Sequence, residues 1–382
     1  MRKILIVVAL IVVCASLFAQ AQITPYGSAR AGYWLNMYDK DHRVGERTVG
    51  DFLLQNNSRF GVNFRNEGLT ARVEYGMGDV ATAGAGTNVN PSLRLVWARQ
   101  QFEGWSLLIG QDTDGTNLFA NQVVSVGTTN GNRHDINLVG YGVVDGGRNM
   151  MVRYRHDCGF YVAAMAPKTG SDPAGNGSAI DAFIPRLNIG YDAKFLDGDL
   201  NLYPTFVVQN YSYNKDFGNE HDGSVTSWLF STTADWKIDA VNLRAQVNYG
   251  TNTGNMGYRF GLAQAGAHSR DANPNRATWD ADKKETKDAT TFGGFLMADY
   301  GLSKVVNLNL GLGYTTTSHD DFHNDATRLG VYLQCTVRAQ RLRITPEIGL
   351  MNDGDSVMNN AEGKKVSLGS MTYFGTQLRM DF

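Results

Sequence analysis

The sequence has no apolar run long enough to cross a membrane as a helix, which takes about 20 consecutive apolar residues. Its one clear apolar run, Ile4–Val13, is about half that length. The run follows the positively charged Arg2 and Lys3 and precedes the small-residue stretch Ala19–Ala21. This order of charged, apolar and small residues is typical of a secretory signal peptide. We therefore expect residues 1–21 to be a signal peptide and residues 22–382 to be one mature domain.

Cysteine is scarce, and a basic excess is missing. Of the 3 cysteines, Cys14 lies in the expected signal peptide. A cysteine there could belong to a lipoprotein signal, but Val13 before it is a poor match to that signal. Cys158 falls in a predicted turn and Cys335 on the apolar face of a predicted strand, so we expect no disulfide between them. The 35 basic and 37 acidic residues give a net charge of −2, which argues against a nucleic-acid partner.

Motifs for catalysis, phosphate binding and metal binding are missing or weak. Neither a P-loop nor a G-x-S-x-G motif occurs. Gly76–Ala81 fits G-x-G-x-x-A, but the next residues, Thr82–Asn88, read as a loop and not as the helix that a dinucleotide site needs. His319 and His323 are metal-ligand types, but they lie in a stretch that reads as a polar loop. We expect no cofactor, no metal and no enzymatic activity.

What the chain does have is an alternation of apolar and polar residues with period two, and it is clearest at the C-terminus. One parity there holds Val366, Leu368, Phe374, Leu378, Met380 and Phe382, and the other holds Ser367, Gly369, Tyr373, Gln377, Arg379 and Asp381. Period two indicates a strand with one apolar and one polar face. A strand of this kind that ends on an aromatic residue is typical of the closing strand of an outer-membrane β-barrel.

The same alternation predicts an all-β transmembrane antiparallel barrel of about sixteen strands. The sixteen segments are Ile23–Asn36, Phe52–Asn66, Leu69–Met77, Ser92–Phe102, Trp105–Gln111, Asn149–His156, Gly159–Ala166, Ala182–Phe195, Asp199–Tyr213, Gly223–Ile238, Val241–Thr251, Ala289–Tyr300, Val305–Thr317, Ala326–Ala339, Leu342–Met351 and Val366–Phe382. Several of these segments are close in length to the roughly 9–11 residues that a tilted strand needs to cross a bilayer.

The connections between these segments alternate in length. Short turns such as Glu67-Gly68 and Gln340-Arg341 are followed by long loops such as residues 112–148 and 252–288. Outer-membrane barrels have short periplasmic turns and long extracellular loops. The alternative, a soluble all-β protein with irregular loops, explains neither this alternation nor the terminal aromatic residue.

Five arginines fall on the polar parity of their segments, and we expect them to line the pore as a basic wall. They are Arg30, Arg59, Arg72, Arg94 and Arg379. An arginine that faces lipid at mid-depth costs about 2–4 kcal/mol, so an inward direction is favoured. Their strands become neighbours when the last strand pairs with the first. The alternative is scattered lumen charge that only solvates the channel.

The segment Ser92–Phe102 contains a conflict of parity. Leu93, Leu95 and Trp97 alternate with Arg94 and are expected to face outward, but Arg99 breaks parity with Arg94. Either Arg99 lies near the membrane interface or a β-bulge intervenes.

The stretch Trp97–Trp105, running on through Leu108–Asp112, resembles the hairpin before the constriction loop of the Gram-negative general porins. In that family the long loop after the fifth strand folds into the barrel and narrows it, with acidic side chains facing arginines on the wall. The resemblance implies that residues 112–148 are such a constriction loop. Its acids would be Asp112, Asp114 and Asp135.

The resemblance also implies a function and a set of partners. The chain would be a porin in the bacterial outer membrane, forming a water-filled channel for passive diffusion of small hydrophilic solutes and ions. Its partners would be outer-membrane lipids and lipopolysaccharide, the barrel-assembly machinery through the C-terminal strand, and two further copies in a homotrimer. One alternative is a surface structural or adhesion barrel with a plugged lumen. Another is a barrel enzyme, for which Ser125, His134 and Asp135 are the only faint candidates.

Overall fold

A computed structural model describes most of the chain after the expected signal peptide. The described residues are 22–42, 45–55, 57–77, 91–116, 118–126, 135–169, 180–213, 223–260, 273–280, 282–360 and 362–382. Residues 1–21 lie outside them, so the signal-peptide prediction stays a prediction.

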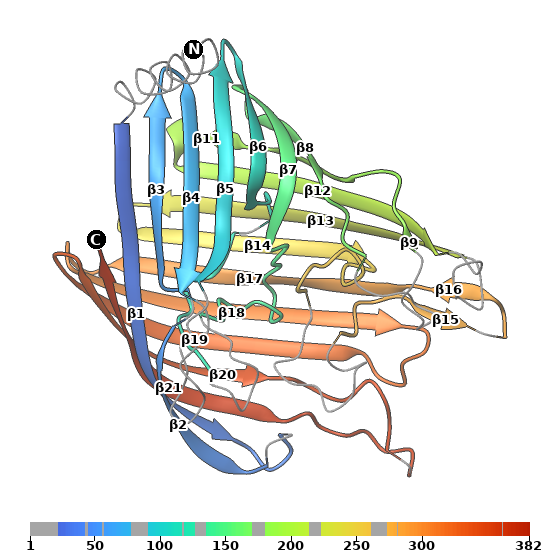
Figure 1. The fold of residues 1–382 in the computed structure, drawn as a ribbon. Coiled ribbons are helices and arrows are strands. Elements are labelled where there is room, and N and C mark those ends of the chain that lie inside the picture. The colour runs from blue at the N-terminus through green and yellow to red at the C-terminus, as the bar shows by residue number, and fades with distance from the viewer. Residues whose placement is uncertain are drawn as a thin grey trace, which may run out of the picture.

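Nearly all regular structure in these residues is β-strand (Figure 1). The strands are β1 (Gln22–Tyr38), β2 (Arg47–Leu54), β3 (Arg59–Asn66), β4 (Leu69–Met77), β5 (Pro91–Phe102), β6 (Trp105–Thr113), β7 (Arg148–His156), β8 (Phe160–Met165), β9 (Ile180–Asp181), β10 (Arg186–Tyr191), β11 (Ala193–Phe195), β12 (Leu200–Tyr213), β13 (Gly223–Ile238), β14 (Val241–Thr251), β15 (Thr278–Asp280), β16 (Glu285–Lys287), β17 (Ala289–Gly301), β18 (Val306–His319), β19 (Ala326–Ala339), β20 (Leu342–Asn352) and β21 (Ser370–Asp381). One short 3-10 helix, η2 (Leu196–Gly198), joins β11 to β12.

In the described part of the chain, no helix is long and apolar enough to cross a bilayer.

The sheet closes on itself. Neighbouring strands of the barrel pair antiparallel, and β21 pairs with β1 from Ser28↔Asp381 to Tyr38↔Met371. Beyond the last ladder pair, Gly27 and Phe382 exchange two backbone hydrogen bonds of 2.8 and 3.0 Å. The closing strand is therefore paired to the last residue of the chain, which leaves no free sheet edge between the two termini.

Two of the barrel strands are interrupted. β2 and β3 both pair with β1, and at the break between them the Arg30 backbone bonds to the Gln55 N–H and the Ser58 hydroxyl. β9, β10 and β11 all pair with β12. Counted as single strands, these pieces give a closed barrel of sixteen strands among the described residues. The predicted fold class is confirmed.

Side chains alternate between the two faces of the barrel, as β18 illustrates. Leu310 and Leu312 are about half exposed on the outer face, whereas Asn309 and Thr315, at positions of opposite parity, are buried on the inner face. Exposed apolar side chains recur on the outer face of strands all around the barrel, among them Val247, Leu296, Leu333, Ile348 and Phe374. This apolar outer surface fits a lipid environment, and the polar parity faces an inner space.

The parity conflict in β5 is resolved by a β-bulge. Glu74 on β4 pairs with Leu95 and its neighbour Tyr75 pairs with Leu93, so Arg94 is the extra residue. A bulge reverses the direction of the side chains after it. Leu95 is accordingly buried and Trp97 packs inward, and the predicted outward direction of these two was wrong.

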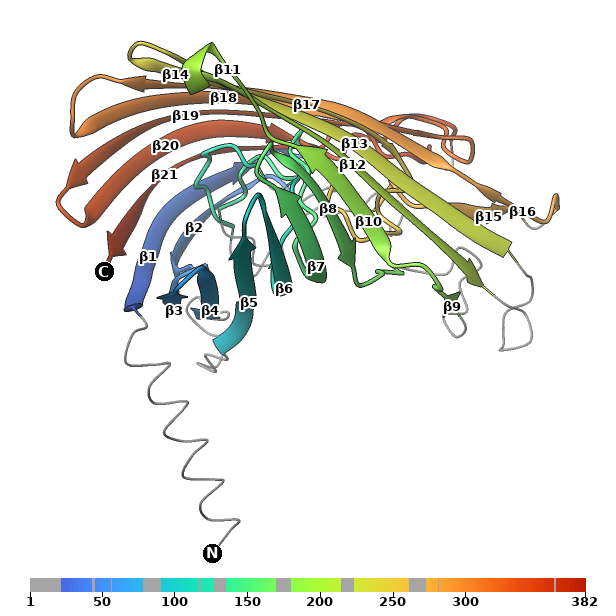
Figure 2. The ribbon, with the colours of Figure 1, turned by 90° about the horizontal axis from the view of Figure 1, so that it is seen from above.

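The long segment between β6 and β7 enters the barrel. Figure 2 shows it on the concave side of the curved sheet, under the strands from β14 to β21. We call residues 114–147 the inserted segment; its described parts are 114–116, 118–126 and 135–147. The β15–β16 hairpin lies elsewhere, at the end of the barrel away from the C-terminus (Figure 1).

Candidate functional site

A buried carboxylate on the inner wall holds the inserted segment. One oxygen of Glu347 on β20 accepts the Val123 backbone N–H at 2.8 Å, and the other accepts the Val124 N–H at 3.1 Å. The Tyr373 hydroxyl on β21 donates to the same carboxylate at 2.9 Å. These three donors offset part of the cost of burying the carboxylate. Glu347 therefore fixes the segment at a defined place on the wall.

Apolar packing supports this attachment. The segment and the inner wall share one buried cluster: Trp34, Tyr38, Ala120, Val124, Val126, Ile136, Leu138, Val139, Tyr141, Val143, Phe295, Met297, Tyr332, Met351, Met371 and Tyr373. Where the two backbones meet, Gly142 has a φ of +112°, and a Cβ on it would lie 2.0 Å from the Gly294 carbonyl oxygen. Only glycine fits this close approach.

Asp135 connects the segment to the basic wall. Its carboxylate forms an ion pair with Arg30 on β1 and accepts a hydrogen bond from the Asn57 side chain. It also accepts a hydrogen bond of 2.6 Å from the Gln377 amide on β21. Asp135 is thus the one predicted loop acid that meets a predicted wall arginine.

Four of the five predicted wall arginines lie together on the inner face. Arg30 and Arg379 are direct cross-strand partners, and Arg59 lies within electrostatic range of Arg379 and Arg94. Between Arg59 and Arg94 lies Glu74, which accepts a 2.7 Å hydrogen bond from Arg94 Nε and lies 3.7 Å from Arg59 Nη1. Positive charge remains in excess over this acid.

Arg72 lies to one side of that group. Its guanidinium stacks over the rings of Tyr26 and Trp97, at 5.3 and 5.8 Å from their centroids, and its Nε donates to Asn63 at 2.8 Å. Stacking on two rings fixes the guanidinium plane.

Asp112 and Asp114 contact other parts of the molecule. Asp112, near the end of β6, pairs with Arg153 Nη2 at 2.8 Å. Asp114 is buried and accepts the Thr116 N–H at 3.0 Å and the Tyr258 hydroxyl at 2.6 Å. Burial, together with the Asp114 charge, raises the pKa of Tyr258, so its hydroxyl stays a donor. These two acids hold the start of the segment and do not face the basic wall.

Two acids were overlooked as site residues although their parity places them inside. Glu74 alternates with Val73 and Tyr75, and Glu347 alternates with Ile348 on β20. The sequence signal that could have identified them is an inward carboxylate beside wall arginines for Glu74, and beside an inward tyrosine for Glu347. Their actual partners depend on strand register, which alternation does not give.

Of the residues considered for a barrel enzyme, Ser125 and Asp135 are described, and both bond to residues outside the inserted segment. The Ser125 hydroxyl accepts hydrogen bonds from the Gln55 amide at 2.5 Å and the Asp135 backbone N–H at 3.2 Å. His134 lies outside the described residues. Among the residues that the structure covers, no group of three or more His, Cys, Asp or Glu side chains is arranged to hold a metal ion.

At the long-loop end, a cluster around Lys287 ties the β15–β16 hairpin to the loop after β18. Lys287 Nζ lies 2.8 Å from Asp280 and 2.8 Å from Asp321. The Thr278 hydroxyl donates to Asp321 and lies 3.1 Å from His319 Nε2. The hydrogen bonds to Asp280 and Asp321 raise the pKa of Lys287, and the bond from Lys287 lowers the pKa of Asp280 to about 2.

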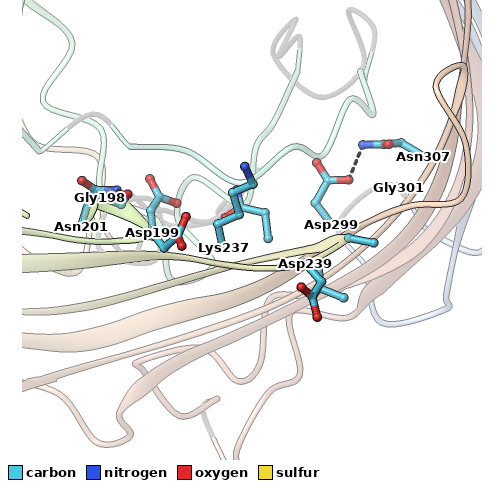
Figure 3. Close-up of a pocket in the computed structure, with 12 residues that line it drawn as sticks. Gly198, Asp199, Asn201, Lys237, Asp239, Asp299, Gly301 and Asn307 are labelled. Carbon is cyan, nitrogen blue, oxygen red and sulfur yellow. Dashed lines mark hydrogen bonds between the residues drawn. The ribbon is translucent and has the colours of Figure 1, made fainter. Parts of the chain in front are cut away.

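At the short-turn end, a cavity of about 440 Å³ lies over the ends of β12 to β18. Figure 3 shows Asp199, Lys237 and Asp299 pointing to one side of the sheet and Asp239 to the other. The dashed line in Figure 3 is the hydrogen bond from Asn307 to Asp299. This part of the wall carries more acidic than basic side chains.

Sequence comparisons find no matching family model and no similar curated protein. Solved structures do match. The outer membrane channel DcaP of Acinetobacter baumannii is 15% identical over 95% of this chain and 98% of that chain, with a TM-score of 0.67. An anion-selective porin from Comamonas acidovorans is 12% identical over 95% and 100%, with a TM-score of 0.56. The chain has the porin fold.

A third match is the trimer form of OmpT, an outer membrane protein of Vibrio cholerae, at 16% identity over 95% of this chain and 99% of that chain, with a TM-score of 0.56. At these identities the matches establish the fold. They confirm that the sequence resembles porins in architecture. Within this porin fold, the inserted segment, Glu347 and the arginines around Glu74 form the candidate functional site.

Proposed function

We propose that the protein is an outer-membrane porin that forms a water-filled channel for passive diffusion of small hydrophilic solutes and ions. The observation that carries this proposal is the closed sixteen-stranded barrel with an apolar outer face and a charged inner wall. Barrels of about 16–18 strands are wide enough for an aqueous channel. Diffusion through such a lumen needs neither a cofactor nor an energy source.

The inserted segment would be the constriction of this channel. Its Asp135 pairs with Arg30, and Arg59, Arg94 and Arg379 extend the positive charge along the adjoining wall. Opposed charges across a narrow passage set a transverse field and tune ion preference. Because arginines outnumber acids here, anions are the favoured ions. Asp112 and Asp114 would act indirectly, by fixing the first turn of the segment.

Single-channel recording with the purified protein in planar bilayers tests the channel function. We expect stable conductance steps and a reversal potential in a salt gradient that indicates anion preference. Arg59→Glu should shift that potential toward cations, whereas Arg72→Gln, outside the arginine group, should change it little. A surface adhesion barrel with a plugged lumen would give no steps, and that result would refute the proposal.

We further propose a homotrimer that is exported with cleavage of residues 1–21, contacts lipopolysaccharide and is inserted by the barrel-assembly machinery through β21. The paired, aromatic-ended C-terminal strand and the trimer form of the similar OmpT support this. Native mass spectrometry of the detergent-extracted protein should give three times the mass of the mature chain. A single-chain mass in mild detergents would argue against the trimer.

A further inference from the structure

Four arginines are direct cross-strand neighbours on four consecutive strands. Arg338 on β19 pairs with Arg343 on β20, Arg343 pairs with Arg379 on β21, and Arg379 pairs with Arg30 on β1. The residues next to them that face outward are exposed and apolar: Val337, Ile344, Leu378 and Met380. All four arginines therefore project inward. We call them the arginine row.

Carboxylates compensate only part of the row. Asp381 lies 2.7 Å from Arg379 Nε and 3.2 Å from Arg343 Nη2, so one acid serves two guanidinium groups. Arg30 is taken by Asp135 on the inserted segment. Arg338 is exposed and forms no ion pair with any described residue. Two carboxylates thus pair with three of the four positive groups, and Arg338, at the short-turn end, has no ion pair among the described residues.

Such a row is unfavourable for the folded chain by itself. Like charges directly opposite each other on a sheet destabilise the pairing, and here three successive pairs do so. Neutral polar side chains, which occupy much of the remaining wall, are enough to line a water-filled lumen. Three successive like-charge pairs, only partly compensated by Asp381 and Asp135, point to a further negative charge that a ligand supplies.

The geometry selects the ligand chemistry. Guanidinium groups bind carboxylates and phosphates through paired hydrogen bonds. Neighbouring strands lie about 4.8 Å apart, so adjacent arginines in the row present donor groups at about that spacing. A solute with two or more acidic groups can engage two or three of them together, whereas a monovalent anion engages one.

We propose that the arginine row binds small polyvalent anions, solutes with two or more phosphate or carboxylate groups, at the short-turn end of the pore. This rests on the proposed channel function. The row runs from Arg338, beside the turn between β19 and β20, up to Arg30 and Asp135 at the inserted segment. Asp299 on the adjoining wall lies within electrostatic range of Arg338. Repulsion from it confines the anion to the arginine side.

Channel block in planar bilayers tests the row. Tripolyphosphate and citrate are added to the short-turn side, with phosphate and acetate as the corresponding simpler anions at equal ionic strength. We expect tripolyphosphate, citrate or both to interrupt the current, more strongly than their simpler counterparts. The two probes show whether phosphate or carboxylate groups are preferred. In Arg338→Gln/Arg343→Gln the blocking concentration should rise about tenfold or more, because two charge-assisted contacts are lost.

Arg99→Gln is the matched control. Arg99 stacks on Trp97, away from the row, so its loss should leave the block within about twofold. Heat-modifiable migration in dodecyl sulfate gels checks that each variant is folded. If the channels are steady and neither polyvalent probe blocks them, anion binding by the row is refuted while the channel function stands. The same holds if the double variant is blocked as strongly as the parent.

Calorimetry on the detergent-solubilised barrel tests the row without relying on conductance. We expect saturable tripolyphosphate or citrate binding that the double variant loses and Arg99→Gln retains. Absence of saturable binding of both probes would overturn the proposal even if the protein conducts, and binding without conductance would leave the row standing while the channel function fails.

Discussion

Replacing Glu347 by glutamine should loosen the inserted segment without disturbing the barrel. The carboxylate gives one oxygen to each of two backbone N–H groups, those of Val123 and Val124. A glutamine amide has a single acceptor oxygen, so its NH₂ group would face the second N–H. A buried donor left without a partner costs about 1–3 kcal/mol. At this cost the detached state of the segment becomes roughly 5–150-fold more populated.

The assay is the current record of single channels. Detachment of the segment widens the passage, so Glu347→Gln should show brief steps to higher conductance, more frequent than in the parent by the same factor. Glu347→Ala removes both acceptors and should give still longer openings. The midpoints of thermal and urea unfolding of the barrel should change less than the single-channel record, because the sixteen-strand ladder stays intact.

Thr345→Val is the matched control for this prediction. Thr345 lies two residues away on the same inner face of β20, and its hydroxyl bonds to Thr336 on β19 at 3.2 Å. It should lower barrel stability slightly and leave the channel record unchanged. Identical records for the parent and Glu347→Gln would mean that the carboxylate does not hold the segment, and the reasoning would be refuted.

Three further predictions concern the segment, the outer face and the long-loop end. Gly142→Ala should displace the segment, because its Cβ would meet the Gly294 carbonyl oxygen 2.0 Å away, and single-channel conductance should rise with little loss of barrel stability in urea. Leu312→Arg, on the lipid-facing side at the middle of β18, should destabilise the barrel by about 2–4 kcal/mol in urea unfolding from lipid vesicles. The Lys287 cluster at the long-loop end should stay intact between about pH 4 and about pH 10. The lowered pKa of Asp280 stabilises the folded loop above the ordinary aspartate pKa, which sets the lower limit. The raised pKa of Lys287 stabilises it below the ordinary lysine pKa, which sets the upper limit. Proteolysis of the hairpin should accordingly be slow at neutral pH in the parent and faster in Lys287→Gln, and equal rates would contradict this.

Strand positions were accessible from the sequence because each strand has one face toward lipid and one toward the lumen. Alternation located β4, β13, β14 and β19 with the bounds that the structure shows. Because Arg99 and Arg94 were out of phase, it also offered a bulge in β5 as one of two explanations, and the structure shows the bulge. It could not say that the bulge falls at Arg94, because a bulge is fixed by the register of the facing strand.

Partners inside the lumen were not accessible in the same way. Arg30 meets Asp135 across 105 residues of chain, and Arg379 becomes a neighbour of Arg343 and Arg30 only through the register of β21 against β20 and β1. Period two assigns each of them a face but no height along the barrel axis. A loop that folds inward carries no periodic signal at all, and the loop acids could therefore be placed only by resemblance.

One departure from alternation nevertheless marks where the loop attaches. In a water-filled barrel the inward parity should be polar, yet Phe295 and Met297 on β17, Tyr332 on β19 and Met371 and Tyr373 on β21 are all inward and buried. Exposed to a wet lumen, these side chains would gain nothing from their position. Covered by the inserted segment, each contributes the burial of an apolar side chain, about 1.5–3 kcal/mol. Apolar and aromatic residues on the inward parity of β17, β19 and β21 therefore indicate, in the sequence itself, the patch of wall on which an inward-folding loop lies.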